Sequence, residues 1–238
     1  MNFRFWITEI ILSVILFVAC TPRSQRGYVI EGKMSGLTDR ALYIVTGSGS
    51  ATKIDTVITQ NGEFHFSAFS ESICPVVIYL EEKSVWFTVY VQNGDEIELS
   101  GHAGYPELIQ INGNKINDLL TGFHQSNADI FEALNDSTGN FNPDSLCNLL
   151  REKAQTVIRE NPQSIASLVL IQDHLIDSYD PKLIGEYLSL IETPAKEDTL
   201  YVRLTNFCSR LERTKTGTLP SKASRKRPTE KSPGIFYK

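Results

Sequence analysis

The chain has 238 residues, of which 41% are hydrophobic and 21% charged, an ordinary globular composition with room for one large or two small domains. Its net charge of −5 gives no reason to expect a nucleic-acid-binding protein. The charge is unevenly placed, because from Arg213 onward eight Lys and Arg residues stand against a single acid, Glu230.

Residues 1–19 are predicted to be an export signal. Arg4 supplies a positive start, and residues 10–18 are apolar except for Ser13. This run is too short to span a bilayer, which takes about 20 residues. It is typical of the apolar core of a signal peptide, and the small residue Ala19 follows at the expected cleavage point.

Phe17-Val18-Ala19-Cys20 resembles the lipobox of bacterial lipoproteins. The resemblance implies that the Cys20 thiol carries fatty acid such as palmitate, and several acyl chains hold a protein stably on a membrane. Residues 20–27 then form a lipid-anchored tether. We expect a cell-envelope protein on the inner or outer membrane, facing the periplasm rather than displayed on the surface. A plain signal peptide and an uncleaved anchor are the alternatives.

Residues 28–112 are predicted to form an antiparallel β-sandwich or barrel of about eight short strands. Apolar residues alternate in short runs, as in Ile54/Thr56/Ile58 and Phe64/Phe66. Asn61-Gly62 and residues 93–95 (Asn-Gly-Asp) mark tight turns, because Asn and Gly tolerate positive φ.

Residues 113–213 are predicted to be a helical segment, packed with the β domain or following it, so that the fold class is α+β. Apolar residues recur at helical spacing from Ile116 onward, and the change of period lies near Gly113. Each predicted helix start places a capping side chain before Pro. These starts are Asn142-Pro143, Asp180-Pro181 and Thr193-Pro194, while Asn161-Pro162 ends one helix and opens the next.

Residues 214–238 are rich in Pro, Ser and Lys and almost lack apolar residues before Ile235, which predicts a disordered basic tail. Such a tail could attract anionic lipid at about 1 kcal/mol per basic residue near the surface. A merely solvated tail is the alternative.

No catalytic, cofactor-binding or metal-binding residue is assigned, so Cys20 is the one predicted site residue. The four histidines, His65, His102, His124 and His174, stand apart in the sequence without a metal-binding motif. Residues 47–50 (Gly-Ser-Gly-Ser) lack the context of a phosphate loop and suit a hairpin. Glu96 and Glu98 share one strand face, which is expected to be solvated.

Acylation of Cys20 leaves three cysteines, Cys74, Cys147 and Cys208, and no C-x-x-C pair. Cys147 and Cys208 fall on predicted helices, where a buried small apolar residue is the default interpretation. A disulfide between them is the less favoured alternative.

Several phrases resemble a domain of unknown function that commonly precedes the thioredoxin fold in lipid-anchored thiol:disulfide oxidoreductases of the ResA/TlpA type. The resemblance spans about residues 28–212. The phrases are residues 28–32 (Tyr-Val-Ile-Glu-Gly), 61–66 (Asn-Gly-Glu-Phe-His-Phe), 91–99 (Val-Gln-Asn-Gly-Asp-Glu-Ile-Glu-Leu), 111–120 (Ile-Asn-Gly-Asn-Lys-Ile-Asn-Asp-Leu-Leu) and 161–164 (Asn-Pro-Gln-Ser). No redox residue carries over, because no position here matches C-x-x-C.

The leading hypothesis is therefore a non-enzymatic, membrane-anchored binding or positioning module of the envelope, for which a separate thioredoxin-like envelope protein is one candidate partner. A second hypothesis is a truncated remnant of an oxidoreductase that lost its thioredoxin domain near Thr214. A third is an envelope enzyme, either a thiol oxidoreductase or an unrecognised hydrolase. No cofactor and no nucleic-acid partner are expected, and the oligomeric state is left open.

Overall fold

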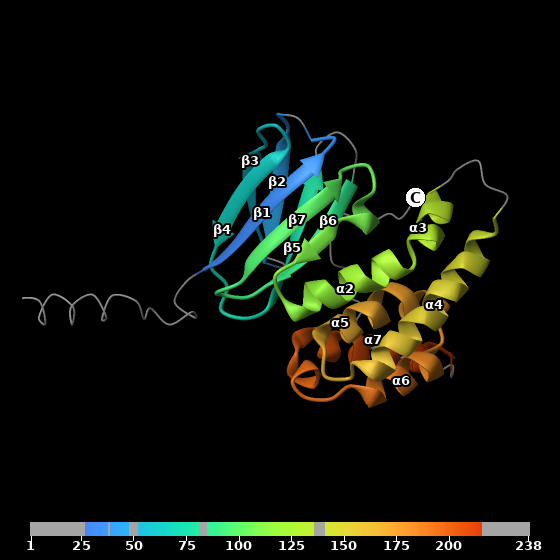
Figure 1. Cartoon of the computed structure of the whole chain (residues 1–238). Coiled ribbons are helices and arrows are strands. Elements are labelled where there is room, and N and C mark those ends of the chain that lie inside the picture. Colours follow the sequence, from blue (N-terminus) through green and yellow to red (C-terminus); the bar gives the residue numbers. More distant parts are fainter. Residues whose placement is uncertain (1–26, 38, 48–51, 81–84, 136–140, 216–238) are drawn as a thin grey trace, which may run out of the picture.

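The computed structural model describes residues 27–37, 39–47, 52–80, 85–135 and 141–215. Within these ranges an eight-stranded sandwich is followed by a helical segment (Figure 1). The predicted α+β class with a sandwich before helices is confirmed. Among the described residues no helix is long and apolar enough to cross a membrane.

The sandwich consists of two four-stranded sheets, which we name sheet A (order β4-β1-β7-β8) and sheet B (order β3-β2-β5-β6). The eight strands are β1 (Tyr28–Ser35), β2 (Ala41–Thr46), β3 (Lys53–Ile58), β4 (Glu63–Ala68), β5 (Cys74–Leu80), β6 (Val85–Val91), β7 (Glu96–His102) and β8 (Gln110–Asn112). The prediction of a wholly antiparallel sandwich is wrong at one pair, because β1 and β7 run parallel. β4 pairs antiparallel with one side of β1, and β7, which follows β5 and β6 of sheet B, pairs with the other side in the same direction as β1.

The sandwich core follows from alternation along the strands. Ile30, Ile44, Ile78 and Val89 are fully buried between the sheets. At Asn61 and Gly62 the backbone has φ of 53° and 82°, so the predicted tight turn between β3 and β4 is confirmed. On β3, in contrast to the strands that fill the core, Ile54 and Ile58 point outward and are 66% and 60% exposed.

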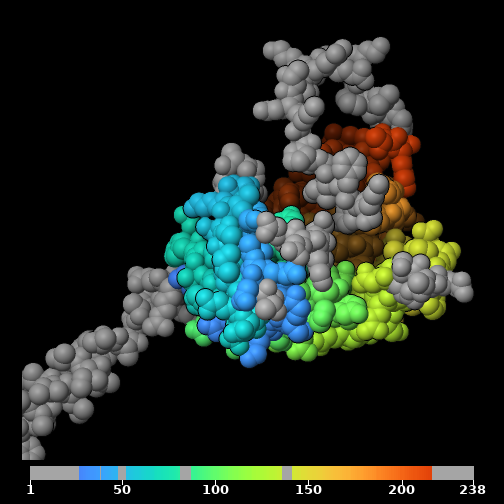
Figure 2. Space-filling model, turned by 90° about the horizontal axis from the view of Figure 1, so that it is seen from above, coloured from blue at the N-terminus to red at the C-terminus, as the bar shows by residue number. Residues whose placement is uncertain are grey.

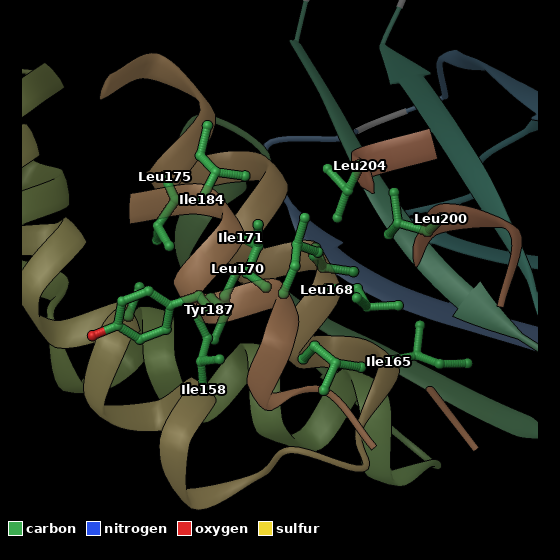
Figure 3. Packing of buried hydrophobic residues seen from close by; sticks show 14 of the residues in the cluster. Ile158, Ile165, Leu168, Leu170, Ile171, Leu175, Ile184, Tyr187, Leu200 and Leu204 are labelled. Atoms are coloured by element: carbon green, nitrogen blue, oxygen red, sulfur yellow. The ribbon is translucent and has the colours of Figure 1, made fainter. Parts of the chain in front are cut away.

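The helical segment begins where the period changes, since β8 ends at Asn112 and α2 begins at Lys115. The helices are α2 (Lys115–Ser126), α3 (Ala128–Asn135), α4 (Pro143–Glu160), α5 (Ile165–Leu170), α6 (Pro181–Leu190) and α7 (Thr199–Lys215). Their buried residues form a second core (Figure 3). Figure 1 shows α2 between the sandwich and the other helices, and the view from above shows the sandwich and the helical core side by side (Figure 2).

Two of the predicted helix starts are confirmed and two are wrong. Asn142 and Asp180 cap α4 and α6 with their side chains. Asn161-Pro162 ends α4 but does not open the next helix, because Ser164 caps α5 instead. Thr193-Pro194 precedes a single 3₁₀ turn, and the last helix starts later.

That last helix is α7, at whose start the Asp198 carboxylate accepts a hydrogen bond from the Leu200 N–H. It continues to Lys215, so Thr214 and Lys215 are helical rather than part of the predicted tail. Residues 216–238, the rest of that tail, lie outside the described residues, as does the export signal with Cys20.

Candidate functional site

The strand edges on one side of the sandwich are closed by α2. β6 is the edge strand of sheet B, and Asn117 of α2 bonds the Tyr90 backbone twice: Nδ2 donates to the carbonyl oxygen (2.8 Å) and Oδ1 accepts from the N–H (3.0 Å). β8 is the edge strand of sheet A, and Thr121 Oγ1 bonds the Ile111 N–H and carbonyl in the same way (3.1 and 3.0 Å). Asn117 and Thr121 are four residues apart and share one helix face.

A third residue, Asn114, completes this joint. It caps α2 by accepting from the Asn117 N–H, and its Nδ2 donates to the Tyr90 carbonyl oxygen (2.8 Å) and to Asp95 Oδ2 (2.7 Å). Asp95 Oδ2 also accepts from the Gln92 N–H at 3.0 Å. Asn117 and Asp95 are 1% and 6% exposed. These groups belong to two of the phrases singled out in the sequence, whose role is thus to join strands to helix.

Tyr90 carries the joint into the helical core. Its neighbours Val89 and Val91 point between the sheets, whereas its own ring belongs to the helical cluster and is 8% exposed. Burial raises the pKa of its hydroxyl. Tyr90 therefore joins the sandwich and the helical core: its backbone belongs to β6 of the sandwich and bonds Asn117 of α2, and its ring packs in the helical core.

A polar hollow of about 730 Å³, which we name the sheet A hollow, lies on sheet A and extends to β3 and the β3–β4 turn, where Val57, Ile58, Gln60 and Asn61 also line it. Its floor is a row of opposed residues, one from each strand: His65, Glu31, Glu98 and Asn112. Side chains on a strand alternate between faces, and all four are exposed to solvent. The sequence predicted Glu96 and Glu98 on one solvated strand face. It did not reveal the acid that neighbours Glu98, which is Glu31 on the parallel strand β1.

A second row of opposed residues, Lys33 and Glu63, lies beside the first, and Lys33 brings a positive charge to the hollow. Lys33 Nζ lies 2.8 Å from Glu63 Oε1, and hydrogen bonding within this pair raises the pKa of Lys33 and lowers that of Glu63. His65 Nδ1 lies 3.4 Å from Glu31 Oε1. Glu98 faces Glu31 across the strands, and like charges placed opposite one another repel. The hollow therefore favours a ligand that brings positive charge or hydrogen-bond donors.

The other sequence candidates are dispersed. Within the described ranges no group of three or more His, Cys, Asp or Glu side chains could hold a metal ion. His102 is exposed beside Tyr105, while His124 and His174 are half-buried against Phe131 and Phe123, at ring distances of 5.0 and 5.1 Å. Burial lowers the pKa of both half-buried histidines to about 4. Residues 48–50 of the Gly-Ser loop lie outside the described ranges.

Cys74, Cys147 and Cys208 are all free thiols, so the alternative of a disulfide between Cys147 and Cys208 is wrong. Cys147 is exposed on α4, whereas Cys208 is buried on α7 with its Sγ donating to the Pro181 carbonyl oxygen at 3.2 Å. Burial raises the pKa of the Cys208 thiol, which makes it a poor nucleophile. The interpretation of Cys208 as a buried apolar residue is confirmed, and that of Cys147 is wrong.

Comparison with known families adds one finding. Residues 28–120 match the family model described as Domain of unknown function (DUF4369). The DUF4369 match covers all eight strands and ends inside α2, after Asn114 and Asn117. The predicted resemblance to a domain of unknown function is thus confirmed as far as residue 120. No curated protein and no solved structure matches the chain.

Proposed function

We propose that this chain is a non-enzymatic lipoprotein of the bacterial cell envelope, anchored through Cys20, whose sandwich binds or positions a partner close to the membrane. The sheet A hollow is the observation that supports binding most directly. It presents two facing carboxylates, an imidazole and an amide in one row on a sheet. Residues held on paired strands keep their relative positions better than residues on loops.

The tether sets the distance from the membrane. Seven residues separate Cys20 from Tyr28, the first residue of β1. An extended chain covers about 3.3–3.6 Å per residue, so Tyr28 lies within roughly 28 Å of an acylated Cys20. The hollow is on the sheet that contains β1, and a partner that reaches it is itself at or near the membrane surface.

A thioredoxin-like envelope protein is the partner that the resemblance favours, because the related domain usually precedes a thioredoxin fold. In this chain the described thiols are dispersed over one strand and two helices, and the amino-acid sequence contains no C-x-x-C motif. The chain would therefore act beside such a protein by holding it. The row of carboxylates and donors in the hollow is the surface available for that contact.

Site-specific photo-cross-linking in cells tests this function. A photoreactive residue at Ser100, in the hollow, is expected to give one discrete adduct that is lost when Glu31 and Glu98 are both changed to Gln. The matched control is the same photoreactive residue at Lys153, which is exposed on α4. Absence of an adduct at Ser100, or the same set of adducts at both positions, contradicts a binding role for the hollow.

A further inference from the structure

The side of the sandwich away from the helices has an open strand edge at β3. Among the strands that the structure describes, β3 pairs with β2 alone, and Figure 1 shows it on the side opposite to α2. On the other side, Asn117 and Thr121 occupy the edges of β6 and β8. Unpaired strand edges readily accept another strand. Of the four edge strands, β6 and β8 are closed by α2, whereas β3 and β4 have no further strand paired to them within the described residues. The sequence of β3 shows which partner its edge would accept.

The backbone of β3 directs alternate residues to that open edge. The Thr59 N–H donates to the Arg40 carbonyl oxygen at 2.9 Å, and the antiparallel register continues from that pair into Ala41 opposite Ile58. Backbone groups of alternate residues point to opposite sides of a strand. Val57, Asp55 and Lys53 thus bond β2, whereas Ile54, Thr56 and Ile58 present their N–H and C=O groups outward.

The side chains of this edge are exposed and of mixed character. Ile54 and Ile58 are 66% and 60% exposed on the outer face of sheet B. Lys53 and Asp55 lie on the other face, which is the face of the half-buried Val57, and both are exposed. An exposed β-branched edge of this kind is a site for strand addition.

Residues 52–56, Thr-Lys-Ile-Asp-Thr, are complementary to themselves when read in the antiparallel direction about Ile54. In that register Ile54 faces Ile54 of a second copy, and each Lys53 faces an Asp55. Thr52 faces Thr56. A register about Asp55 instead places two carboxylates opposite one another, which is unfavourable.

Backbone geometry favours the same register. The Ile54 pair is then a hydrogen-bonded pair, because both residues direct their N–H and C=O groups to the open edge. The two Lys53–Asp55 pairs are non-hydrogen-bonded pairs, in which side chains lie closest, with Cα atoms about 4.5 Å apart. Charge complementarity and backbone direction therefore select one partner, an identical strand.

We propose that β3 is the dimer interface of this protein, pairing antiparallel with β3 of a second copy about Ile54. The two copies of sheet B then form one continuous eight-stranded sheet, with a two-fold axis through the Ile54 pair. The contact is isologous, so it closes on itself and stops at two copies. Both helical segments lie at the outer ends of this sheet.

Charge exchange tests the pairing. Analytical ultracentrifugation of the full chain in detergent is expected to give twice the mass of one chain, with dissociation on dilution. Lys53→Asp alone and Asp55→Lys alone each place like charges opposite one another and are expected to weaken dimerisation at least tenfold. The double variant Lys53→Asp/Asp55→Lys restores the opposite-charge pairs and the dimer. A single-chain mass at every concentration, or a double variant no better than the single ones, overturns the proposal.

Disulfide cross-linking in intact cells tests the register. In a Cys147→Ser background, Ile54→Cys is expected to yield a disulfide-linked dimer, since facing residues of a hydrogen-bonded pair have Cα atoms about 5.5 Å apart. Thr56→Cys is the matched control, because in this register residue 56 faces residue 52 of the second copy, four residues away from the other introduced cysteine. Equal cross-linking at both positions, or cross-linking at Thr56 alone, contradicts this register. Unchanged unfolding midpoints show that each variant is folded.

Discussion

Asn117 gives Tyr90 the two hydrogen bonds that a neighbouring strand would give, so a helix side chain ends sheet B at β6. Buried backbone groups need partners, and a strand edge facing a protein interior has no water to supply them. The amide of Asn offers one donor and one acceptor at a suitable spacing. The same device recurs at Thr121 and Ile111 on sheet A.

Removing this amide is expected to destabilise the whole fold. Asn117→Ala leaves the Tyr90 N–H without its partner and takes one of the two donors from its carbonyl. A buried polar group left without a partner costs about 1–3 kcal/mol, and the loss of one further hydrogen bond costs about 0.5–1.5 kcal/mol. We therefore expect a loss of about 2–4 kcal/mol in the free energy of unfolding. Urea denaturation measures it, with Gln125→Ala on the exposed side of α2 as the control. A change no larger than that of the control contradicts the role of Asn117.

Two glycines should respond to alanine in opposite directions. A Cβ on Gly32 would lie 2.0 Å from Phe64 Cε1 in the sandwich core, and overpacking a core costs about 1–3 kcal/mol. Gly122 lies in α2, where an added Cβ would have nothing within 4 Å, and Gly→Ala in a helix gains roughly 0.5–1 kcal/mol. Gly32→Ala combined with Phe64→Leu should recover part of the loss. Thermal unfolding of these variants and the parent chain measures the effects, and a neutral Gly32→Ala contradicts the close approach.

Most of the fold could be predicted, because alternation and helical spacing report burial directly. Turn residues such as Asn61-Gly62 and caps such as Asn142 and Asp180 act locally, and their positions follow from sequence alone. The alternation of Ile54 and Ile58 locates β3, but alternation does not show which face of a strand is covered, and both side chains are exposed.

The sheet A hollow could not be predicted, because its floor depends on long-range pairing. Glu31 and Glu98 lie far apart in the sequence and become neighbours only through the parallel pairing of β1 with β7. The edge-closing role of Asn117 was hidden for the same reason: its partner Tyr90 lies on a strand that the sequence cannot place at an edge. The resemblance to a domain of unknown function drew attention to residues 91–99 and 111–120, but it did not reveal that they join the strands to α2.

Acid is expected to destabilise the helical segment through His124 and His174. Burial lowers the pKa of each to about 4 in the folded chain, below the value of 6.5 in an unfolded chain. The unfolded chain thus binds more protons between these values, and stability should fall as pH drops from about 6.5 to about 4. Urea midpoints between about pH 4 and pH 7.5 measure this.

A matched variant isolates the contribution of these histidines. Exchanging His174 for Gln should flatten the pH dependence, whereas Gln125→Ala, on the exposed side of α2, should leave it unchanged. Midpoints of the parent chain that stay constant over this range contradict the burial of neutral imidazoles against Phe123 and Phe131.

The three described thiols should differ in reactivity. Cys147 is exposed, Cys74 is half-buried and Cys208 is buried. With Ellman's reagent, Cys147 is expected to react within the native protein and Cys208 only after unfolding, because access and thiolate content both limit the reaction. Cys147→Ser should remove the fast phase. A fast phase that persists in Cys147→Ser and disappears in Cys208→Ser contradicts the burial of Cys208.

The mass of the mature N-terminal peptide tests the lipid-anchored function most directly. Mass spectrometry of the protein isolated from cell membranes is expected to show a peptide that begins at Cys20 and carries acyl chains. Cys20→Ser should abolish this species and release the protein from the membrane fraction. An N-terminal peptide with an unmodified Cys20, or a Cys20→Ser variant that stays fully membrane-bound, contradicts the lipid anchor and the envelope function built on it.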